Sequence, residues 1–146
     1  MFGEGLNSFL KNNLAIQALI GTPSTRSDKT PGVFPMQASV DEPTLPFLVY
    51  MTIHAENEQS FEGANRFMVA RYRIASWGST YGNAKTLANT VKLALNGFRG
   101  TFSDGSVIES VRDITEADTT DDLPHGTVYG THTDYEIAYE DHSDGH

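Results

Sequence analysis

Apolar residues recur at helical spacing in two parts of the chain. Near the N-terminus they predict a short amphipathic helix over Gly5–Asn13, followed by a second turn or brief helix that Gly21 ends. Farther along, one apolar stripe predicts a helix that Ser79 or Thr80 caps and Gly97 closes. The residues of this stripe are Ala84, Leu87, Ala88, Val91 and Leu95.

Segments rich in β-branched and aromatic residues predict strands between and after these helices. In Phe67–Trp77 the apolar residues alternate, so one face of that strand is buried and the other is partly solvated. The other predicted strands are Val33–Val40, Phe47–His54, a strand that leaves the Asp104-Gly105 turn and continues through Val111, and Tyr129–Tyr139. We therefore predict an α+β fold, with an antiparallel sheet of about four to six strands and two helices packed on one face.

Polar segments separate the predicted elements. Thr22–Gly32 is rich in turn formers and predicts a surface loop. Glu56–Asn65 predicts a long hairpin loop, in which Phe61 is either an interface anchor or an incidental aromatic in a flexible tip. Asp113–Gly126 is acidic and predicts another loop, and the polar tail Glu140–His146 predicts a disordered end.

The composition limits the classes of function. A chain of 146 residues is most simply one domain, here residues 1–146, and the absence of cysteine excludes disulfides and thiol chemistry. A net charge of −9 with only 10 Lys and Arg residues argues against direct DNA binding, which usually needs a basic face. No membrane-spanning apolar run and no signal peptide are present, so we expect a soluble, intracellular chain while it folds.

Candidate chemical sites are weak. Asp118, Asp121 and Asp122 could coordinate a divalent cation, but they lack the glycine and terminal glutamate of an EF-hand loop, and a solvated acidic loop is favoured. His132 and Asp134 share a strand face without a nucleophile motif and are interpreted as a pair on a wet sheet face. We therefore predict no catalytic residue, no metal and no cofactor.

Three arginines on or beside the predicted strand Phe67–Trp77 are candidate interface residues. Arg66, Arg71 and Arg73 could form ion pairs between subunits of an acidic protein, or they could simply solvate the sheet surface. The carboxylates Asp118 and Asp121, with Asp122, are the acidic interface candidates.

Several elements occur in an order that is similar to one protein family. They are the N-terminal helix with Leu6 and Leu10, the strand Leu45–Ile53, the segment Arg71–Ala84 leading into the second helix, and the closing strand YGTHTDYEIAY. In this order the chain resembles the tail-completion, or tail-terminator, proteins of long-tailed bacteriophages. The resemblance covers the chain from about Leu6 to Tyr139 and includes no catalytic motif.

The resemblance implies a virion structural protein that is not an enzyme. It implies a homo-oligomeric ring, commonly a hexamer, assembled in the host cytoplasm at the head-proximal end of the tail tube. Such a ring ends tube growth and joins the tail to the head, so its partners are further copies of itself, the tail tube protein and the head-tail connector, with DNA only passing through the lumen. One alternative is a connector or neck ring component; another is a small α+β enzyme or ligand-binding domain, which would need an apolar pocket.

Overall fold

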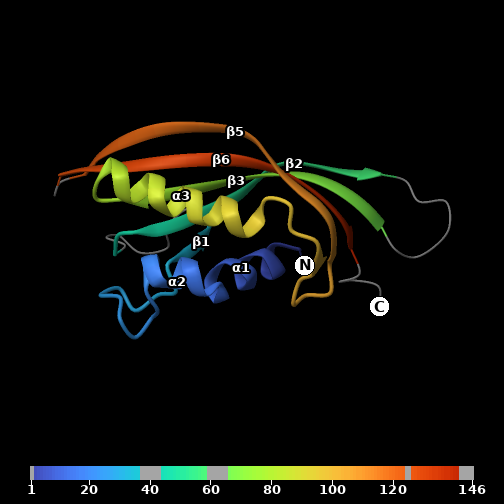
Figure 1. The fold of residues 1–146 in the computed structure, drawn as a ribbon, viewed down its shortest axis with the longest axis horizontal. Helices are drawn as coiled ribbons and strands as arrows, with labels where there is room; N and C mark the ends of the chain where they lie inside the picture. The colour runs from blue at the N-terminus through green and yellow to red at the C-terminus, as the bar shows by residue number, and fades with distance from the viewer. Residues whose placement is uncertain (1, 37–43, 59–65, 124–125, 142–146) are drawn as a thin grey trace.

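The computed structural model describes residues 2–36, 44–58, 66–123 and 126–141, which form an α+β fold, the class that was predicted (Figure 1). The elements in chain order are α1 (Phe2–Asn12), α2 (Leu14–Ile20), β1 (Val33–Pro35), β2 (Phe47–Glu58), β3 (Arg66–Gly78), α3 (Tyr81–Leu95), β4 (Gly100–Thr101), β5 (Val107–Leu123) and β6 (Gly126–Asp141).

The strands form one sheet of six, in the order β1-β2-β3-β6-β5-β4. The four pairs from β2 to β4 are antiparallel, but β1 lies parallel to β2, with Val33 opposite Leu48. The sheet is therefore mixed, and the prediction of a wholly antiparallel sheet was wrong at this edge. The start of β1 lies beside the start of β2, so the two strands run in the same direction.

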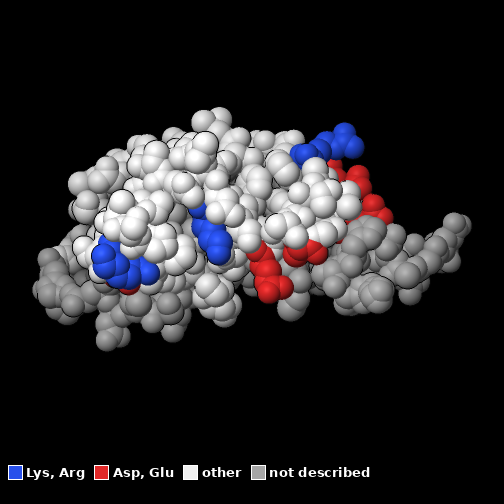
Figure 2. All heavy atoms as spheres, turned by 90° about the horizontal axis from the view of Figure 1, so that it is seen from below, with Lys and Arg blue, Asp and Glu red and all other residues white. Residues whose placement is uncertain are grey.

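Three helices accompany the sheet, where two were predicted. The Asn13 side chain accepts a hydrogen bond from the backbone N–H of Ile16 at 3.1 Å, so the brief second turn becomes a separate capped helix, α2. α3 lies on β3 and β6, whereas α1 and α2 contact β1 and α3 respectively, so the helices do not share the sheet face equally. The helix side of the molecule is largely uncharged (Figure 2).

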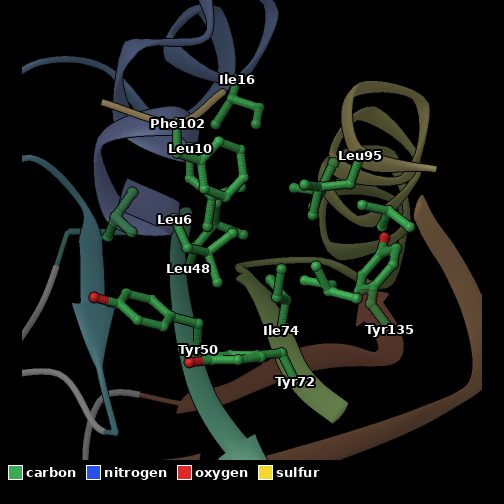
Figure 3. Close-up of a cluster of buried hydrophobic side chains, with 14 of the residues drawn as sticks. Leu6, Leu10, Ile16, Leu48, Tyr50, Tyr72, Ile74, Leu95, Phe102 and Tyr135 are labelled. Carbon is green, nitrogen blue, oxygen red and sulfur yellow. The ribbon is translucent and has the colours of Figure 1, made fainter. Parts of the chain in front are cut away.

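The predicted helix stripe fills the main core. Thr80 caps α3 by accepting from the backbone N–H of Asn83 at 3.1 Å, and all five residues of the stripe are buried, as predicted. They meet the alternate residues of β3, among them Tyr72 and Ile74, together with residues from α1 and α2 (Figure 3). A second, smaller cluster lies on the opposite sheet face, because its residues alternate along the strands with those of the main core. Its buried members are Phe34, Phe47 and Val49.

The acidic segment Asp113–Gly126 is not the loop that was predicted. β5 continues through it to Leu123 and pairs with β6, with Asp113 opposite Tyr135 and Leu123 opposite Gly126. The acidic side chains led to the wrong prediction, because the hydrogen bonds between strands use backbone groups and do not depend on the side chains. Carboxylates can occupy a strand whose outer face and edge are exposed to water.

Other boundaries also moved. β2 extends to Glu58, so the first residues of the predicted loop Glu56–Asn65 belong to a strand, while its remainder lies outside the described residues. The predicted strand Val33–Val40 is confirmed only as far as Pro35, and residues 37–43 are not described. β6 ends at Asp141, so the start of the predicted disordered tail is a strand, with residues 142–146 outside the described part.

The predicted surface loop Thr22–Gly32 contains a buried arginine. Arg26 is only 2% exposed, and its guanidinium donates to the carbonyl oxygens of Ile20 at 2.8 Å, Pro46 at 2.7 Å and Thr44 at 2.6 Å. The Asp28 carboxylate accepts from the same guanidinium at 3.0 Å. This pair ties the end of α2 to the segment that leads into β2.

Candidate functional site

Three of the predicted interface residues, Arg71, Arg73 and Asp118, take part in two sets of ion pairs, one on each side of the sheet. The first set joins α3 to β5. Lys85 of α3 donates to Glu116 of β5 at 2.7 Å and lies 3.0 Å from Asp118. Lys92, one heptad along the same helix, donates to Glu116 at 2.8 Å. The acidic strand segment, defined as residues 113–122, is thus held against the helix by two lysines.

These contacts change the acidity of the groups involved. The hydrogen bonds from Lys85 and then Lys92 hold the pKa of the Glu116 carboxyl below its ordinary value. The hydrogen bond from Lys85 likewise lowers the pKa of Asp118, and those from Thr131 and Tyr81 act in the same direction. The same carboxylates, Glu116 first, raise the pKa of the Lys85 ammonium group. Lys85, Glu116 and Asp118 are therefore charged at neutral pH.

The three predicted aspartates are not brought together. Asp118 accepts from Tyr81 and from Thr131, each at 3.0 Å, and Asp122 accepts from Thr127 at 2.8 Å. Asp121 lies opposite Val128 and, as an odd-numbered residue of this strand, faces away from the other two. Within the described residues no group of three His, Asp or Glu side chains could hold a metal ion. The cation alternative therefore has no geometric support here.

The second set lies on the opposite sheet face, between β3 and β6. Arg71 donates to Asp134 at 2.8 Å and Arg73 donates to the same carboxylate at 2.8 Å. Asp134 is only 1% exposed, so the prediction of a wet His132–Asp134 pair was wrong for the aspartate. Burial raises the pKa of the Asp134 carboxyl, but the hydrogen bonds from Arg73 and Arg71 outweigh it and leave the pKa below its ordinary value.

These contacts bear directly on the arginine candidates. Arg71 and Arg73 have a partner within their own chain, although each side chain remains 39% exposed and can reach a neighbour. Arg66 begins β3, where its backbone lies opposite Asp141. Phe61 lies outside the described residues. The partner that sequence reasoning missed is Asp134, which the pairing of β3 with β6 places opposite Arg73. The alternation of β6 separates its two faces, but it does not by itself show which β3 residues lie beside Asp134.

A groove of about 290 Å³ adjoins these pairs. Its lining includes His54, Arg71, Arg112 and Glu136, and the last two form an ion pair at 2.9 Å. The apolar pocket with a few converging polar groups that the enzyme alternative requires is a different kind of site. The rest of the lining is formed by Val69, Ala70 and Ile114, and its charged residues Arg71, Arg112 and Glu136 already pair within the chain.

The comparisons with known proteins were made on the whole chain. One family, described as "Tail completion protein gp17", matches residues 4–137. The chain belongs to this family. Membership of this family gives the chain a structural role in the tail of a bacteriophage virion. No curated protein matches it.

A solved structure shares the fold of the chain. A chain described as "Virion of native gene transfer agent (GTA) particle" matches with a TM-score of 0.61 and 14% identity, over 92% of this chain and 90% of that chain. At this identity the likeness concerns the fold alone. In the described residues of the tail completion protein, no helix is long and apolar enough to span a bilayer.

Proposed function

We propose that the protein forms a homo-oligomeric ring, most simply a hexamer, at the head-proximal end of the tail tube, where it ends tube growth and joins the tail to the head. The observation that carries the proposal is the family match over residues 4–137, which accounts for nearly the whole chain. We further propose that it is not an enzyme, because the matched family is a structural one and the ion pairs described above hold strands and helices of the fold together.

The surface of the subunit supports assembly with other chains. β4 pairs only with Val107 and Ile108 of β5, so within the described residues the outer edge of β5 beyond Ser110 has no strand beside it. An open edge of this length is usually covered by another chain or protected by charge. The acidic strand segment provides that charge, and it would give the inner wall of a ring a net negative surface along which DNA slides without binding.

Electron microscopy tests the proposal at two levels. The purified protein, alone or mixed with tail tubes, should form rings of uniform diameter that sit on one end of the tube. Particles from a phage that lacks the gene should contain filled heads and separate tails of irregular length. A protein that stays monomeric and binds no tube, together with normal joining in the mutant, would rule out the proposed role.

A further inference from the structure

α2 and α3 contain no acidic residue, although the chain contains 19. α2 contains no charged residue at all, and α3 contains only Lys85 and Lys92, which pair with carboxylates of β5. Figure 2 views the molecule from the side on which α1 and α2 lie, where white surface predominates between separate basic and acidic groups. The absence of charge here contrasts with β5, whose exposed segment contains five carboxylates between residues 113 and 122.

One leucine of each helix is strongly exposed. Leu14, the first residue of α2, is 80% exposed, and Leu93, in the last turn of α3, is 86% exposed. They are the two most exposed large hydrophobic residues in the described part of the chain. The two helices contact each other, and the remaining exposed residues of both are small or uncharged. Depletion of charge around exposed large apolar residues is typical of the centre of a protein–protein interface.

We propose that a helix patch on this side is buried against a neighbouring copy of the same chain. The patch consists of Leu14, Ala15 and Ala18 of α2 and Thr86, Asn89 and Leu93 of α3, which are all exposed. This inference rests on the proposed ring, and it goes further by naming the surface that closes the ring.

The charge of the chain favours a second copy as the occupant. Each copy carries −9, so two copies repel each other wherever their acidic surfaces approach. The helix patch is a surface on which two such copies can meet without placing carboxylates together. A basic partner would instead be attracted to the acidic strand segment, at a different place on the subunit.

The chain also offers a matching counterpart. A ring requires a heterologous contact, in which one surface meets a different surface of the next copy. Met36 is 66% exposed and follows Phe34, a member of the small apolar cluster on the sheet face away from the helices. Trp77 packs against that cluster and is half-buried. The helix patch on one side and this apolar end on the other would let each subunit bind a neighbour on both sides.

Site-directed cross-linking with an apolar photoreactive group tests the contact. The chain has no cysteine, so a Leu93→Cys variant can be labelled at one position with a benzophenone maleimide. A Thr120→Cys variant, labelled at an exposed position of the acidic strand segment, is the control. Irradiation should give a covalent dimer from the first variant, with the cross-link mapping near Met36. Equal or smaller dimer yield from Leu93→Cys than from Thr120→Cys would overturn the inference.

Charge substitutions give a second test. Leu14→Asp and Leu93→Lys introduce charges that suit the helix ends where they lie, so folding should be preserved. Each should raise the protein concentration for half-maximal ring formation by at least about tenfold, measured by sedimentation velocity, which corresponds to about 1.4 kcal/mol. Ile114→Asp, an exposed apolar residue of β5, should change it less than about twofold and is the matched control.

The outcomes separate the inference from the proposed function. If the wild-type protein forms rings and both leucine variants form them at the same concentration, the helix patch is not the contact, while the ring remains. If the wild-type protein forms no ring with or without tail tubes, the proposed function fails and the inference fails with it. Circular dichroism melting of each variant shows whether it is folded, and for any variant that does not fold the cross-linking result decides.

Discussion

Lys85 and Glu116 are joined at 2.7 Å, and this contact fastens the central helix α3 to the acidic strand β5. Lys92 reaches the same carboxylate at 2.8 Å from one heptad along the helix. The two lysines are the only charged residues of α3, and both form ion pairs with β5. The pairing allows a segment with five carboxylates to lie in a sheet beside the core.

Replacing Glu116 with Gln should weaken this attachment moderately. Both lysines would lose their shared carboxylate, and exposed pairs contribute about 0.2–1 kcal/mol each, so a loss of about 0.4–2 kcal/mol is expected. Urea unfolding followed by circular dichroism measures the change. Asp121→Asn, on the other face of the same strand, removes one charge without touching either lysine and should change stability by less than about 0.5 kcal/mol. Equal effects of the two substitutions would show that net charge, and not the lysine contacts, is responsible.

The buried pair of Arg26 and Asp28 should matter more. Arg26→Ala leaves the Asp28 carboxylate and three carbonyl oxygens without their donor, and breaking a buried pair in this way costs about 3–5 kcal/mol. Asp28→Asn keeps the shape of the side chain and should cost less. The measurement is again chemical unfolding, with Lys29→Ala, an exposed neighbour, as the control. An Arg26→Ala protein as stable as the wild type would show that water replaces the guanidinium at no cost.

The same pair makes stability depend on acid. Burial raises the pKa of the Asp28 carboxyl, but hydrogen bonds from Arg26, Thr44 and Thr30 outweigh it and hold the pKa well below the ordinary 3.8. A carboxyl whose pKa is lower in the folded chain stabilises the fold above its unfolded value, and this contribution is lost as the pH falls below that value. The wild-type protein should therefore lose stability progressively below about pH 4, and Asp28→Asn should show a shallower loss over the same range.

The core helix gives a stricter test of the fold. Leu87 is buried on the stripe of α3, so Leu87→Asp would place an unpaired carboxylate in the main core. The cost is several kcal/mol, which is comparable with the total stability of a domain of this size, and the variant should be unfolded. Loss of a cooperative thermal transition is the measurement. Thr86→Asp, the exposed neighbour on the same helix, should stay folded.

Sequence reasoning succeeded where the side-chain pattern and the capping residues predict the same element. For α3, the apolar stripe, the Thr80 cap and the glycine exit all point to one helix, and the structure has it. It failed at β5, where a run of acidic and polar side chains conceals a strand that pairs with β6, the element directly after it. It also missed Arg26, because a buried arginine depends on carbonyl groups that only the folded chain brings together.

The candidate site shows the same division. The arginines of β3 were recognised as candidates, but their intramolecular partner Asp134 depends on the register between β3 and β6, which no local pattern specifies. Register is set by tertiary packing of the two strands. The resemblance to the tail-completion family, in contrast, could be recognised from the sequence. It depends on the order of helices and strands along the chain and not on which residues pair between strands.

The loop candidate Phe61 should affect assembly and not folding. If it anchors a contact between subunits or with the tube, Phe61→Ala should leave the melting temperature unchanged and weaken ring formation or tube binding by about tenfold, as expected for an aromatic anchor. Sedimentation velocity and binding to purified tails measure this. Gln59→Ala, in the same predicted loop, is the control. Unchanged assembly of Phe61→Ala would show that the loop is only a connector.

Ring assembly should survive moderate salt, and the ring should not bind duplex DNA. Two of the three arginine candidates, Arg71 and Arg73, already pair with Asp134 in their own chain. Few ion pairs therefore remain between subunits, and apolar contact must supply most of the free energy of ring assembly. Raising the salt from about 0.15 M to about 1 M shortens the Debye length from about 8 Å to about 3 Å, which screens repulsion between the acidic subunits as well as attraction. The concentration for half-maximal ring formation should therefore fall or stay constant, as measured by sedimentation velocity.

Fluorescence anisotropy with labelled duplex DNA at low salt should show no binding, because the charge of −9 repels the phosphates. Dissociation of the ring by salt, or tight binding of DNA, would show that charge attraction dominates and that the inner wall is not the negative surface proposed here.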